Sequence, residues 1–280
     1  MKKWAFINDD FVLEENASIH YRDLSVQRGY GVFDFLKAVN RTPLFLEDHL
    51  NRFFYSAQQM HLPVAQTKKE LQDIVVELLA KNGAADCGIR LTLTGGYSAD
   101  GYQLARPNLI ISQHAFQLPS EEQFFKGIHL MSHEHQRQLP QVKSLDYLMA
   151  IWLQPLLRQR QADDILYHHN GLVTECPRAN FFAVTKDDRI VTPRHNILKG
   201  ITRHRILELA QNRFEIEERD LTLQEVMQAR EAFITSTTKN VLPVLSIDGT
   251  AIGQNTPGTL TRQLAALLQS RLQSHAPQHQ

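Results

Sequence analysis

The chain has 280 residues, of which 42% are hydrophobic and 21% charged, so it is long enough for two domains that each bury a core. Thirty basic residues balance thirty acidic ones, which leaves no net positive charge to attract nucleic acid. Cys87 and Cys176 lack the spacing of a metal site or disulfide framework, as is usual in a reducing compartment. No stretch approaches the length of about 18 apolar residues that a membrane span needs. We therefore expect a cytoplasmic protein that binds a small molecule rather than nucleic acid or a membrane.

Residues 1–115 alternate strand-like and helix-like patterns, which predicts an N-terminal α+β domain. Apolar residues at helical spacing predict helices over 47–61 and 68–82, and Gly83 is the expected C-cap of the second. Alternating or β-branched apolar residues predict the strands, namely a strand pair over 4–12 and single strands over 32–39, 89–94 and 108–114.

Residues 116–122 have no periodicity and contain Pro119, so we predict an interdomain linker there. Residues 123–273 then form a C-terminal domain, and residues 274–280 are expected to be a disordered tail. Within this domain Asn170-Gly171 suits a type I′ turn and predicts a hairpin over 164–175. The other expected elements are a strand over 128–132, a helix over 146–160, a hairpin over 181–191, helices over 202–212, 223–230 and 259–272, and a strand over 232–237.

Three motifs of this domain follow one another in a chemically suggestive order. Lys143 lies in the segment 141–148, Glu175 follows in the segment 174–182, and Gly200-Ile201-Thr202 then opens a helical pattern. A lysine amine can form an imine with an aldehyde, a carboxylate can keep a pyridine nitrogen protonated, and NH groups at a helix start can bind phosphate. In this order the motifs resemble those of the class IV (fold type IV) aminotransferases, which use pyridoxal 5′-phosphate.

The resemblance covers nearly the whole chain and implies an α/β (α+β) enzyme of two domains, similar to the D-amino acid aminotransferases, with the cofactor in the cleft between the domains. It makes Lys143 the catalytic residue, which binds the cofactor and then, as a free amine, moves a proton between the substrate Cα and the cofactor C4′. It assigns Glu175 to the pyridine nitrogen. Without this resemblance, Lys143 could be an ordinary surface lysine and Glu175 a solvated glutamate at a strand end.

The resemblance also implies which residues bind the cofactor phosphate. The backbone of Ile201 and Thr202, the Thr202 hydroxyl and the Thr238 hydroxyl carry over from the family's phosphate site. Arg52, three residues after His49 on the first long helix, carries over as a phosphate-binding arginine. The alternatives are an exposed helix arginine and a hydroxyl cluster without function, since such clusters are common in loops.

The substrate site departs from the family pattern in two places. Many relatives carry Tyr-Gly-x-x-Val-Phe-Glu, whereas an ungapped alignment places Arg28 at the aromatic position and Phe33-Asp34 at its end. The Arg-x-His motif that captures the α-carboxylate in the Bacillus type of D-amino acid transaminase is absent after Thr94. Arg28 and Arg178 are therefore the candidates for carboxylate binding, since guanidinium groups suit bidentate recognition. A surface or interface salt bridge is the alternative for either arginine.

Two arginines would suit dicarboxylates, and the pattern resembles a less common group of D-amino acid transaminases that lack the Arg-x-His motif. We expect Phe33, Thr238 and Lys239 to contribute to substrate binding as well. The predicted reaction moves the amino group of D-glutamate or D-alanine to a 2-oxo acid such as 2-oxoglutarate. Members of the family are usually homodimers, so Arg28 could act in the neighbouring subunit's site.

Other functions stay open at this point. A branched-chain L-amino acid aminotransferase and an aminodeoxychorismate lyase share the fold and the cofactor residues, and a carrier could bind the cofactor without turnover. His129, His133 and His135, with Glu134, could suggest a metal site, because alternate residues of a strand share one face. We expect no metal, since no further ligand cluster exists and a solvated strand is the commoner explanation.

Overall fold

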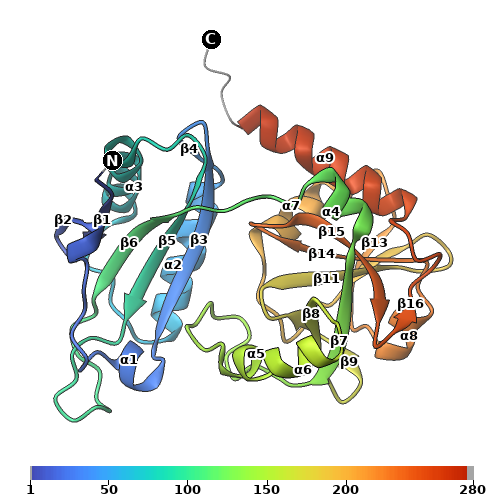
Figure 1. The fold of residues 1–280 in the computed structure, drawn as a ribbon, viewed down its shortest axis with the longest axis horizontal. Coiled ribbons are helices and arrows are strands. Elements are labelled where there is room, and N and C mark those ends of the chain that lie inside the picture. Colours follow the sequence, from blue (N-terminus) through green and yellow to red (C-terminus); the bar gives the residue numbers. More distant parts are fainter. Residues whose placement is uncertain (1, 276–280) are drawn as a thin grey trace. The chain divides into compact units, whose positions relative to one another are not determined.

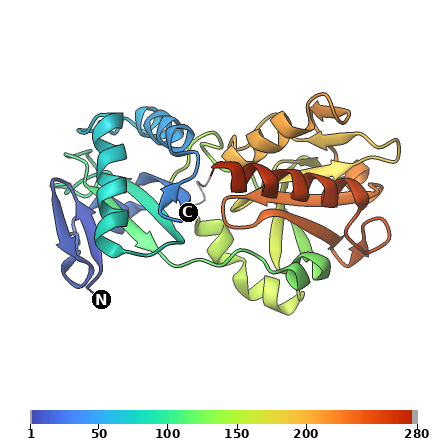
Figure 2. The ribbon, with the colours of Figure 1, turned by 90° about the horizontal axis from the view of Figure 1, so that it is seen from above.

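The computed structural model describes residues 2–275, and their contacts divide the chain into two units of mixed helix and sheet (Figures 1 and 2). The first unit comprises the residues up to Phe116 together with the later segment Val142–Asp146. The second unit comprises Gln117–Gln141 and Tyr147–Gln273. Each unit has its own sheet, which gives the α+β architecture that the sequence predicted.

The first unit is built on a six-stranded sheet in which every neighbouring pair of strands is antiparallel (Figure 1). The strand order is β2-β1-β6-β5-β3-β4. Its strands are β1 (Trp4–Ile7), β2 (Asp10–Leu13), β3 (Gly31–Val39), β4 (Thr42–Pro43), β5 (Cys87–Thr94) and β6 (Leu109–His114). Its helices are the 3-10 turn η1 (Glu14–Asn16), α1 (Leu24–Arg28), α2 (Leu46–Gln59) and α3 (Lys68–Asn82).

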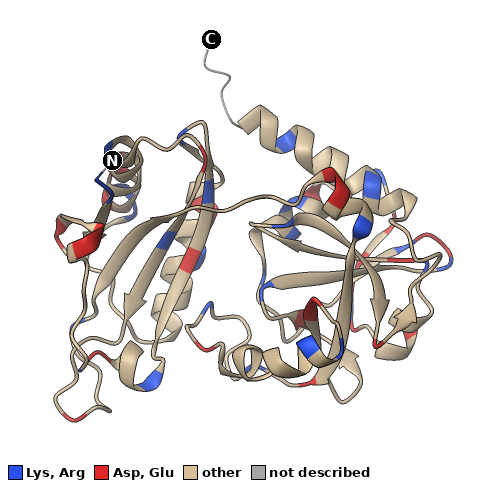
Figure 3. Ribbon diagram, viewed as in Figure 1, with Lys and Arg blue, Asp and Glu red and all other residues tan. Residues whose placement is uncertain are grey.

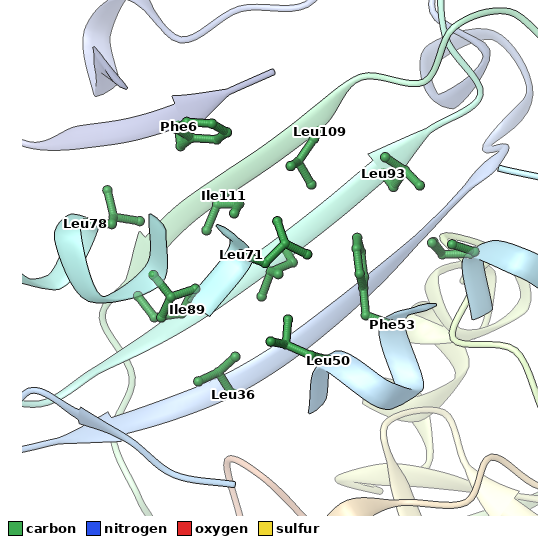
Figure 4. Close-up of a cluster of buried hydrophobic side chains, with 14 of the residues drawn as sticks. Phe6, Leu36, Leu50, Phe53, Leu71, Leu78, Ile89, Leu93, Leu109 and Ile111 are labelled. Carbon is green, nitrogen blue, oxygen red and sulfur yellow. The ribbon is translucent and has the colours of Figure 1, made fainter. Parts of the chain in front are cut away.

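The core of the first unit lies between this sheet and the two long helices α2 and α3 (Figure 4). Leu50 and Phe53 of α2, and Leu71 and Leu78 of α3, recur at helical spacing, so each helix presents one apolar stripe. These side chains meet alternate residues of the strands, such as Leu36 of β3 (Figure 4). The stripe and the alternation explain why the periodicity of the sequence located these elements.

The second unit is built on a ten-stranded sheet with the main order β13-β12-β11-β14-β15-β7-β8-β9, to which β10 and β16 add at the side. Parallel pairs join β7 to β8 and β15, and β12 to β13. Its strands are β7 (Ile128–Glu134), β8 (Asp164–His169), β9 (Leu172–Val173), β10 (Glu175–Cys176), β11 (Ala179–Val184), β12 (Ile190–Thr192), β13 (Ile216–Glu218), β14 (Glu231–Ser236), β15 (Asn240–Ile247) and β16 (Thr250–Ala251). Its helices are α4 (Glu121–Lys126), α5 (Leu148–Trp152), α6 (Gln154–Gln159), α7 (Ile201–Ala210), α8 (Leu223–Met227) and α9 (Thr259–His275).

Elements with strong local signals form as predicted. Helix α3 spans Lys68–Asn82, begins with a capping box between Thr67 and Glu70, and ends at Gly83 with a left-handed φ of 71°. The turn after β8 has a φ of 50° at Asn170 and 75° at Gly171, as a type I′ turn requires. In these places the residues that start, stop or turn the chain are adjacent in the sequence.

One expected helix was wrong, and the bounds of two other segments differ from the expectation. The helix predicted over 146–160 is two short helices, α5 and α6, and Pro155 lies in the first turn of the second, where its missing N–H does no harm. The first unit ends at Phe116, inside the predicted linker 116–122, and residues 116–120 are neither helix nor strand. The last two residues of the predicted linker already belong to α4, whose start is fixed by a capping box between Ser120 and Gln123. Of the predicted disordered tail, Ser274 and His275 belong to α9, and residues 276–280 lie outside the described part of the chain.

The segment around Lys143 also differs from the predicted domain organisation. We expected residues 123–273 to form one domain, but Val142–Asp146 groups by its contacts with the first unit. This short stretch pairs with the start of β3 through a bridge between Val32 and Ser144. Lys143 therefore belongs to the first unit, although the chain on both sides of its segment belongs to the second.

Three further observations bear on function. Lys and Arg are interspersed with Asp and Glu along both units, which matches the balanced composition (Figure 3). No helix among residues 2–275 is long and apolar enough to cross a membrane. Within the same residues no group of three or more His, Cys, Asp or Glu side chains is arranged to hold a metal ion, and this includes His129, His133 and His135.

The inward face of α3 can be tested by a matched pair of substitutions. Leu78 is 0% exposed and Val76, two residues earlier, is 54% exposed. We expect Leu78→Ala to lower the free energy of unfolding by about 2 to 5 kcal/mol, because it leaves a cavity in the core. Val76→Ala should change it by less than about 0.5 kcal/mol. Urea unfolding followed by circular dichroism measures both, and equal losses would contradict the packing described.

Candidate active site

The backbone of Lys143 is fixed against β3 by hydrogen bonds on both sides. Phe33 donates its N–H to the Lys143 carbonyl at 2.9 Å, and Leu145 donates to the Gly31 carbonyl at 2.9 Å. The Lys143 N–H donates to the Ser56 hydroxyl of α2 at 3.2 Å. A Cβ on Gly31 would lie 2.8 Å from the Leu145 side chain, so glycine permits this close approach.

The amine of Lys143 lies over an aromatic ring that it shares with a second cation. Its Nζ is 4.5 Å from the ring centroid of Phe33, and the guanidinium carbon of Arg90 is 4.0 Å from the same centroid. Both distances are typical of cation–π contacts. The structure thus brings the predicted substrate residue Phe33 beside Lys143, and it adds Arg90, which the sequence did not single out.

A buried carboxylate on β3 organises the residues next to this lysine. Asp34 is fully buried and accepts hydrogen bonds from Arg52 Nε and Nη2 at 2.8 Å each, and its Oδ1 lies 2.6 Å from His49 Nδ1. Burial alone would raise the pKa of Asp34, but the charges of Arg52 and His49 outweigh it and hold that pKa well below its usual range. Asp34 is therefore ionised at neutral pH, and it fixes both side chains on α2.

His49 is close enough to Lys143 for the charge of the amine to affect it. Burial lowers the pKa of His49, and the cations Arg52 and Lys143 lower it further, which together outweigh the attraction of Asp34. His49 is therefore neutral at neutral pH. Because ionised Asp34 can only accept, the proton of the neutral ring lies on Nδ1.

Arg52, predicted to bind the cofactor phosphate, uses two of its three nitrogens to hold Asp34. Its Nη1 has no hydrogen-bond partner among the residues that the structure describes. The ion pair orients the guanidinium and leaves one nitrogen for a ligand. Phosphate binding by Arg52 therefore stays a prediction that concerns Nη1 in particular.

In the second unit, Glu175 is the centre of a network of four donors. Its Oε1 accepts from Arg137 Nη2 at 2.8 Å and Nε at 3.1 Å. Its Oε2 accepts from the Leu198 N–H at 3.0 Å and from Asn180 Nδ2 at 3.3 Å. Hydrogen bonds to the charged form, one partner being a cation, favour the ionised carboxylate in spite of burial. This is the state that a carboxylate beside a protonated pyridine nitrogen requires.

Helix α7 begins where the sequence predicted a phosphate site. Gly200 is its N-cap, no side chain caps it, and the first helical hydrogen bond runs from His204 N–H to the Gly200 carbonyl at 2.9 Å. The N–H groups of Ile201 and Thr202 therefore have no carbonyl partner within the helix. Such groups, with the positive end of the helix dipole, suit a phosphate.

A buried hydroxyl on the same face of the sheet as Glu175 also fits a bound ligand. Glu175, Asn180 and Thr235 lie directly opposite one another on the neighbouring strands β10, β11 and β14, so their side chains share one face of the sheet. The Thr235 hydroxyl is buried and has no hydrogen-bond partner among the described residues, which is rare for a buried polar group. The hydroxyl of Thr238, in the next turn, likewise has no partner in the described part of the chain. These groups fit a cofactor with a polar ring and a phosphate.

The two arginines predicted to bind the substrate carboxylate, Arg28 and Arg178, are both exposed. Arg28 ends α1, is exposed, and donates only to the Gln27 carbonyl among the described residues, at 3.0 Å. Arg178 is exposed at the two-residue turn between β10 and β11, and within residues 2–275 no carboxylate pairs with it. Both guanidinium groups are therefore available for a carboxylate ligand.

Lys239 has a different partner from the one we expected. Its amine donates to the buried carboxylate of Asp164 at 2.9 Å, and its N–H donates to the Ser236 hydroxyl at 3.1 Å. A buried carboxylate needs a compensating cation, and Lys239 provides it. The amine is thereby engaged in the fold, so its substrate role has no support from these contacts.

Sequence reasoning missed several residues of the site. Asp34 and Asn180 stand inside motifs that the sequence had already singled out, so their positions offered a signal although their partners did not. Thr235 stands in the same hydroxyl cluster as Thr238 but was given no role, and Arg90 did not clearly match a family position. Arg137 offered no signal, because it acquires its place only through contacts made in the fold.

Comparisons with known proteins agree on one family. The family described as amino-transferase class IV matches residues 31–247. A D-alanine aminotransferase of Staphylococcus epidermidis is 30% identical over 280 residues, which cover 97% of this chain and 99% of the relative. A putative branched-chain-amino-acid aminotransferase of Methanocaldococcus jannaschii is 30% identical over 92% of this chain and 93% of its own. The crystal structure of the Escherichia coli branched-chain amino acid aminotransferase superposes with a TM-score of 0.91 at 22% identity, covering 99% of this chain and 97% of that one.

The ion pairs of Asp34 predict how acid affects stability. A carboxyl group whose pKa is lowered in the folded state stabilises the fold above its unfolded pKa of about 3.9, and the stabilisation is lost as the pH falls toward the folded value. At about pH 7, Asp34→Asn should therefore cost about 3 to 5 kcal/mol, because Arg52 is left without its carboxylate. Urea unfolding from about pH 7 to about pH 3 should show this difference shrinking below about pH 4. A constant difference would contradict the pairing.

Proposed function

Because the chain belongs to the class IV aminotransferases, we propose that it moves the amino group of a D-amino acid to a 2-oxo acid, with pyridoxal 5′-phosphate as cofactor. D-glutamate and D-alanine are the proposed donors and 2-oxoglutarate the proposed acceptor. The observation that carries the chemistry is the buried Glu175 carboxylate, which Arg137, Leu198 and Asn180 hold in place by hydrogen bonds to both of its oxygens. The D-alanine aminotransferase relative, covered almost end to end, supports the choice of substrate.

Pyridoxal phosphate, when bound, supplies the electron sink that lets a proton leave the substrate Cα. With the cofactor bound, Lys143 would take that proton and return it at C4′, and its fixed backbone would keep the amine in place over Phe33. Glu175 holds the positive charge at the ring nitrogen. Arg137 pairs with Glu175 at 2.8 Å and would keep its carboxylate in position.

The phosphate would be held by groups of two kinds. The N–H groups of Ile201 and Thr202 and the hydroxyls of Thr202 and Thr238 are neutral donors. Arg52 adds a charge-assisted hydrogen bond from Nη1, in an orientation that Asp34 fixes. Neutral donors at a helix start set the position of the phosphate, and the cation adds to its affinity.

The substrate carboxylates would be bound by Arg28 and Arg178, neither of which has a carboxylate partner among the described residues. Arg90 is a further candidate, since it shares the Phe33 ring with Lys143. More than one arginine favours a dicarboxylate such as D-glutamate or 2-oxoglutarate. We propose a homodimer in which Arg28 of one subunit acts in the site of the other, and a cytoplasmic location, which suits two buried free cysteines.

A branched-chain L-amino acid aminotransferase is the second candidate. The M. jannaschii relative favours it at 30% identity. The two functions differ in what the site must bind beside the α-carboxylate. A branched apolar side chain needs no second cation, whereas a dicarboxylate does.

The first experiment follows the visible absorbance of the purified protein while D-glutamate, D-alanine, L-leucine and L-glutamate are added separately. We expect D-glutamate and D-alanine to convert the cofactor band and the L-amino acids to leave it, and Lys143→Ala to respond to none of them. Conversion by L-leucine alone would move the chain to the branched-chain group. Pyruvate release from aminodeoxychorismate without an oxo acid acceptor would indicate a lyase, and an absent band would refute the cofactor.

The carboxylate-binding arginines predict a change in substrate affinity. Arg28→Ala and Arg178→Ala should each lower kcat/KM for D-glutamate by about 10- to 100-fold, the range for a lost hydrogen bond to a charged group. The loss should appear mainly in KM, because the reacting atoms are untouched. Steady-state kinetics with D-glutamate and 2-oxoglutarate measure it, and exposed Arg213→Ala is the matched control. Wild-type KM in both variants would exclude them from the site.

A further inference from the structure

Asn180 connects two parts of the second unit that serve opposite ends of the cofactor. It follows the β10–β11 turn, pairs with Glu175 across the two strands, and is 5% exposed. Its Nδ2 donates to Glu175 Oε2 at 3.3 Å and to the Leu198 carbonyl at 2.7 Å. Leu198 in turn donates its N–H to the same Glu175 oxygen at 3.0 Å. Glu175, Asn180 and Leu198 therefore form a closed ring of three hydrogen bonds.

Only one orientation of the Asn180 amide makes this ring. The group faces a carboxylate oxygen and a carbonyl oxygen, both of which accept and neither of which can donate. Both N–H groups of Nδ2 are used, and the opposite orientation would place Oδ1 against two acceptors. The amide is thus fixed in direction as well as in position.

The oxygen of the Asn180 amide explains why position 200, at the start of α7, is a glycine. A Cβ on Gly200 would lie 2.1 Å from Asn180 Oδ1, well below any normal contact. The φ of Gly200 is −71°, which any residue adopts, so the backbone does not require glycine there. What requires glycine is the close approach of Asn180 to the N-cap of the helix.

We infer that Asn180 is a positioning residue that fixes the distance between the Glu175 carboxylate and the start of α7. It would not touch the cofactor. This inference rests on the proposed function, in which Glu175 binds the pyridine nitrogen and α7 binds the phosphate. A rigid cofactor gains from both contacts together only when their separation matches its length, so the spacing determines affinity for the whole molecule and not for its parts.

The test measures the dissociation constants of the apoprotein for pyridoxal 5′-phosphate, pyridoxal and inorganic phosphate. For Asn180→Ala we expect the first to rise about 10- to 100-fold, as when a group that orients a ligand-binding side chain is removed. The constants for pyridoxal and for phosphate should change much less, because each molecule uses only one of the two contacts and gains nothing from their spacing. Asn180→Asp keeps the shape but presents an acceptor to Glu175, so its affinity should fall at least as far.

Asn108→Ala is the matched control. Asn108 is also 5% exposed and donates to a buried carboxylate, that of Asp23, at 2.7 Å. Its loss should lower the melting temperature of the apoprotein as Asn180→Ala does, without changing the affinity for pyridoxal phosphate. A loss of cofactor affinity in both variants would show a general effect of destabilisation and overturn the inference.

Gly200→Ala tests the same contact from the other side and is available if Asn180→Ala does not fold. We expect it to weaken pyridoxal phosphate binding by pushing Asn180 away, and the double variant Gly200→Ala/Asn180→Ala to bind no more weakly than Asn180→Ala alone. Additive losses would overturn the inference.

Two further results for Asn180→Ala would overturn the inference. One is an unchanged dissociation constant for pyridoxal phosphate, and the other is a loss of affinity for inorganic phosphate as large as the loss for pyridoxal phosphate. If the wild-type apoprotein bound no pyridoxal phosphate, the proposed function would fail together with the inference. Wild-type binding with an unaffected Asn180→Ala would overturn only the role of Asn180.

Discussion

Glu175 can remain charged inside the second unit only because donors reach both of its oxygens. A buried carboxylate without partners would cost more free energy than a domain of this size can spare. Four of its hydrogen bonds come from Arg137, Leu198 and Asn180, which the chain supplies from three separate stretches. The loop before α7 and the segment before Lys143 are therefore both attached to this one side chain.

Asp34 imposes the same condition on the first unit. Here the two side-chain partners, His49 and Arg52, come from one turn of α2, and the Phe35 N–H adds a backbone hydrogen bond at 2.8 Å. The two carboxylates differ in what they leave free. Asp34 leaves one guanidinium nitrogen available and keeps a neutral histidine close to Lys143, whereas Glu175 keeps its own charge available.

Most of the first unit could be predicted because its elements are determined locally. The stripe of α3, its capping box and Gly83 lie within one stretch of the sequence, and so do Asn170 and Gly171 of the type I′ turn. The two short helices after Lys143 could not be predicted in the same way. Their apolar residues continue one helical pattern across the break between α5 and α6. Pro155 was the one residue of this stretch whose chemistry indicated that the helix is interrupted.

For the candidate site, the sequence indicated the roles of some residues but not the contacts that hold them. Resemblance to a family gave roles to Lys143 and Glu175, because their motifs are short and contiguous. It did not identify their hydrogen-bond and ion-pair partners, since such a partner can lie anywhere in the chain. Lys239 pairs with Asp164, which lies 75 residues earlier, and no periodicity or motif connects two such positions. Asp34 and Asn180 were visible in the sequence as motif positions, but their functions follow from hydrogen bonds that only the fold reveals.

The placement of Val142–Asp146 restricts how this protein could be rebuilt. The chain leaves the first unit after Phe116, returns for these five residues, and leaves again at Tyr147. A gene fragment ending at residue 116 would encode the Asp34 cluster but no Lys143, and the start of β3 would lack the segment bonded to it. The two units are therefore not modules that recombination could exchange by a single crossover between them. An exchange that kept the catalytic lysine with its own unit would need further breakpoints on either side of five residues.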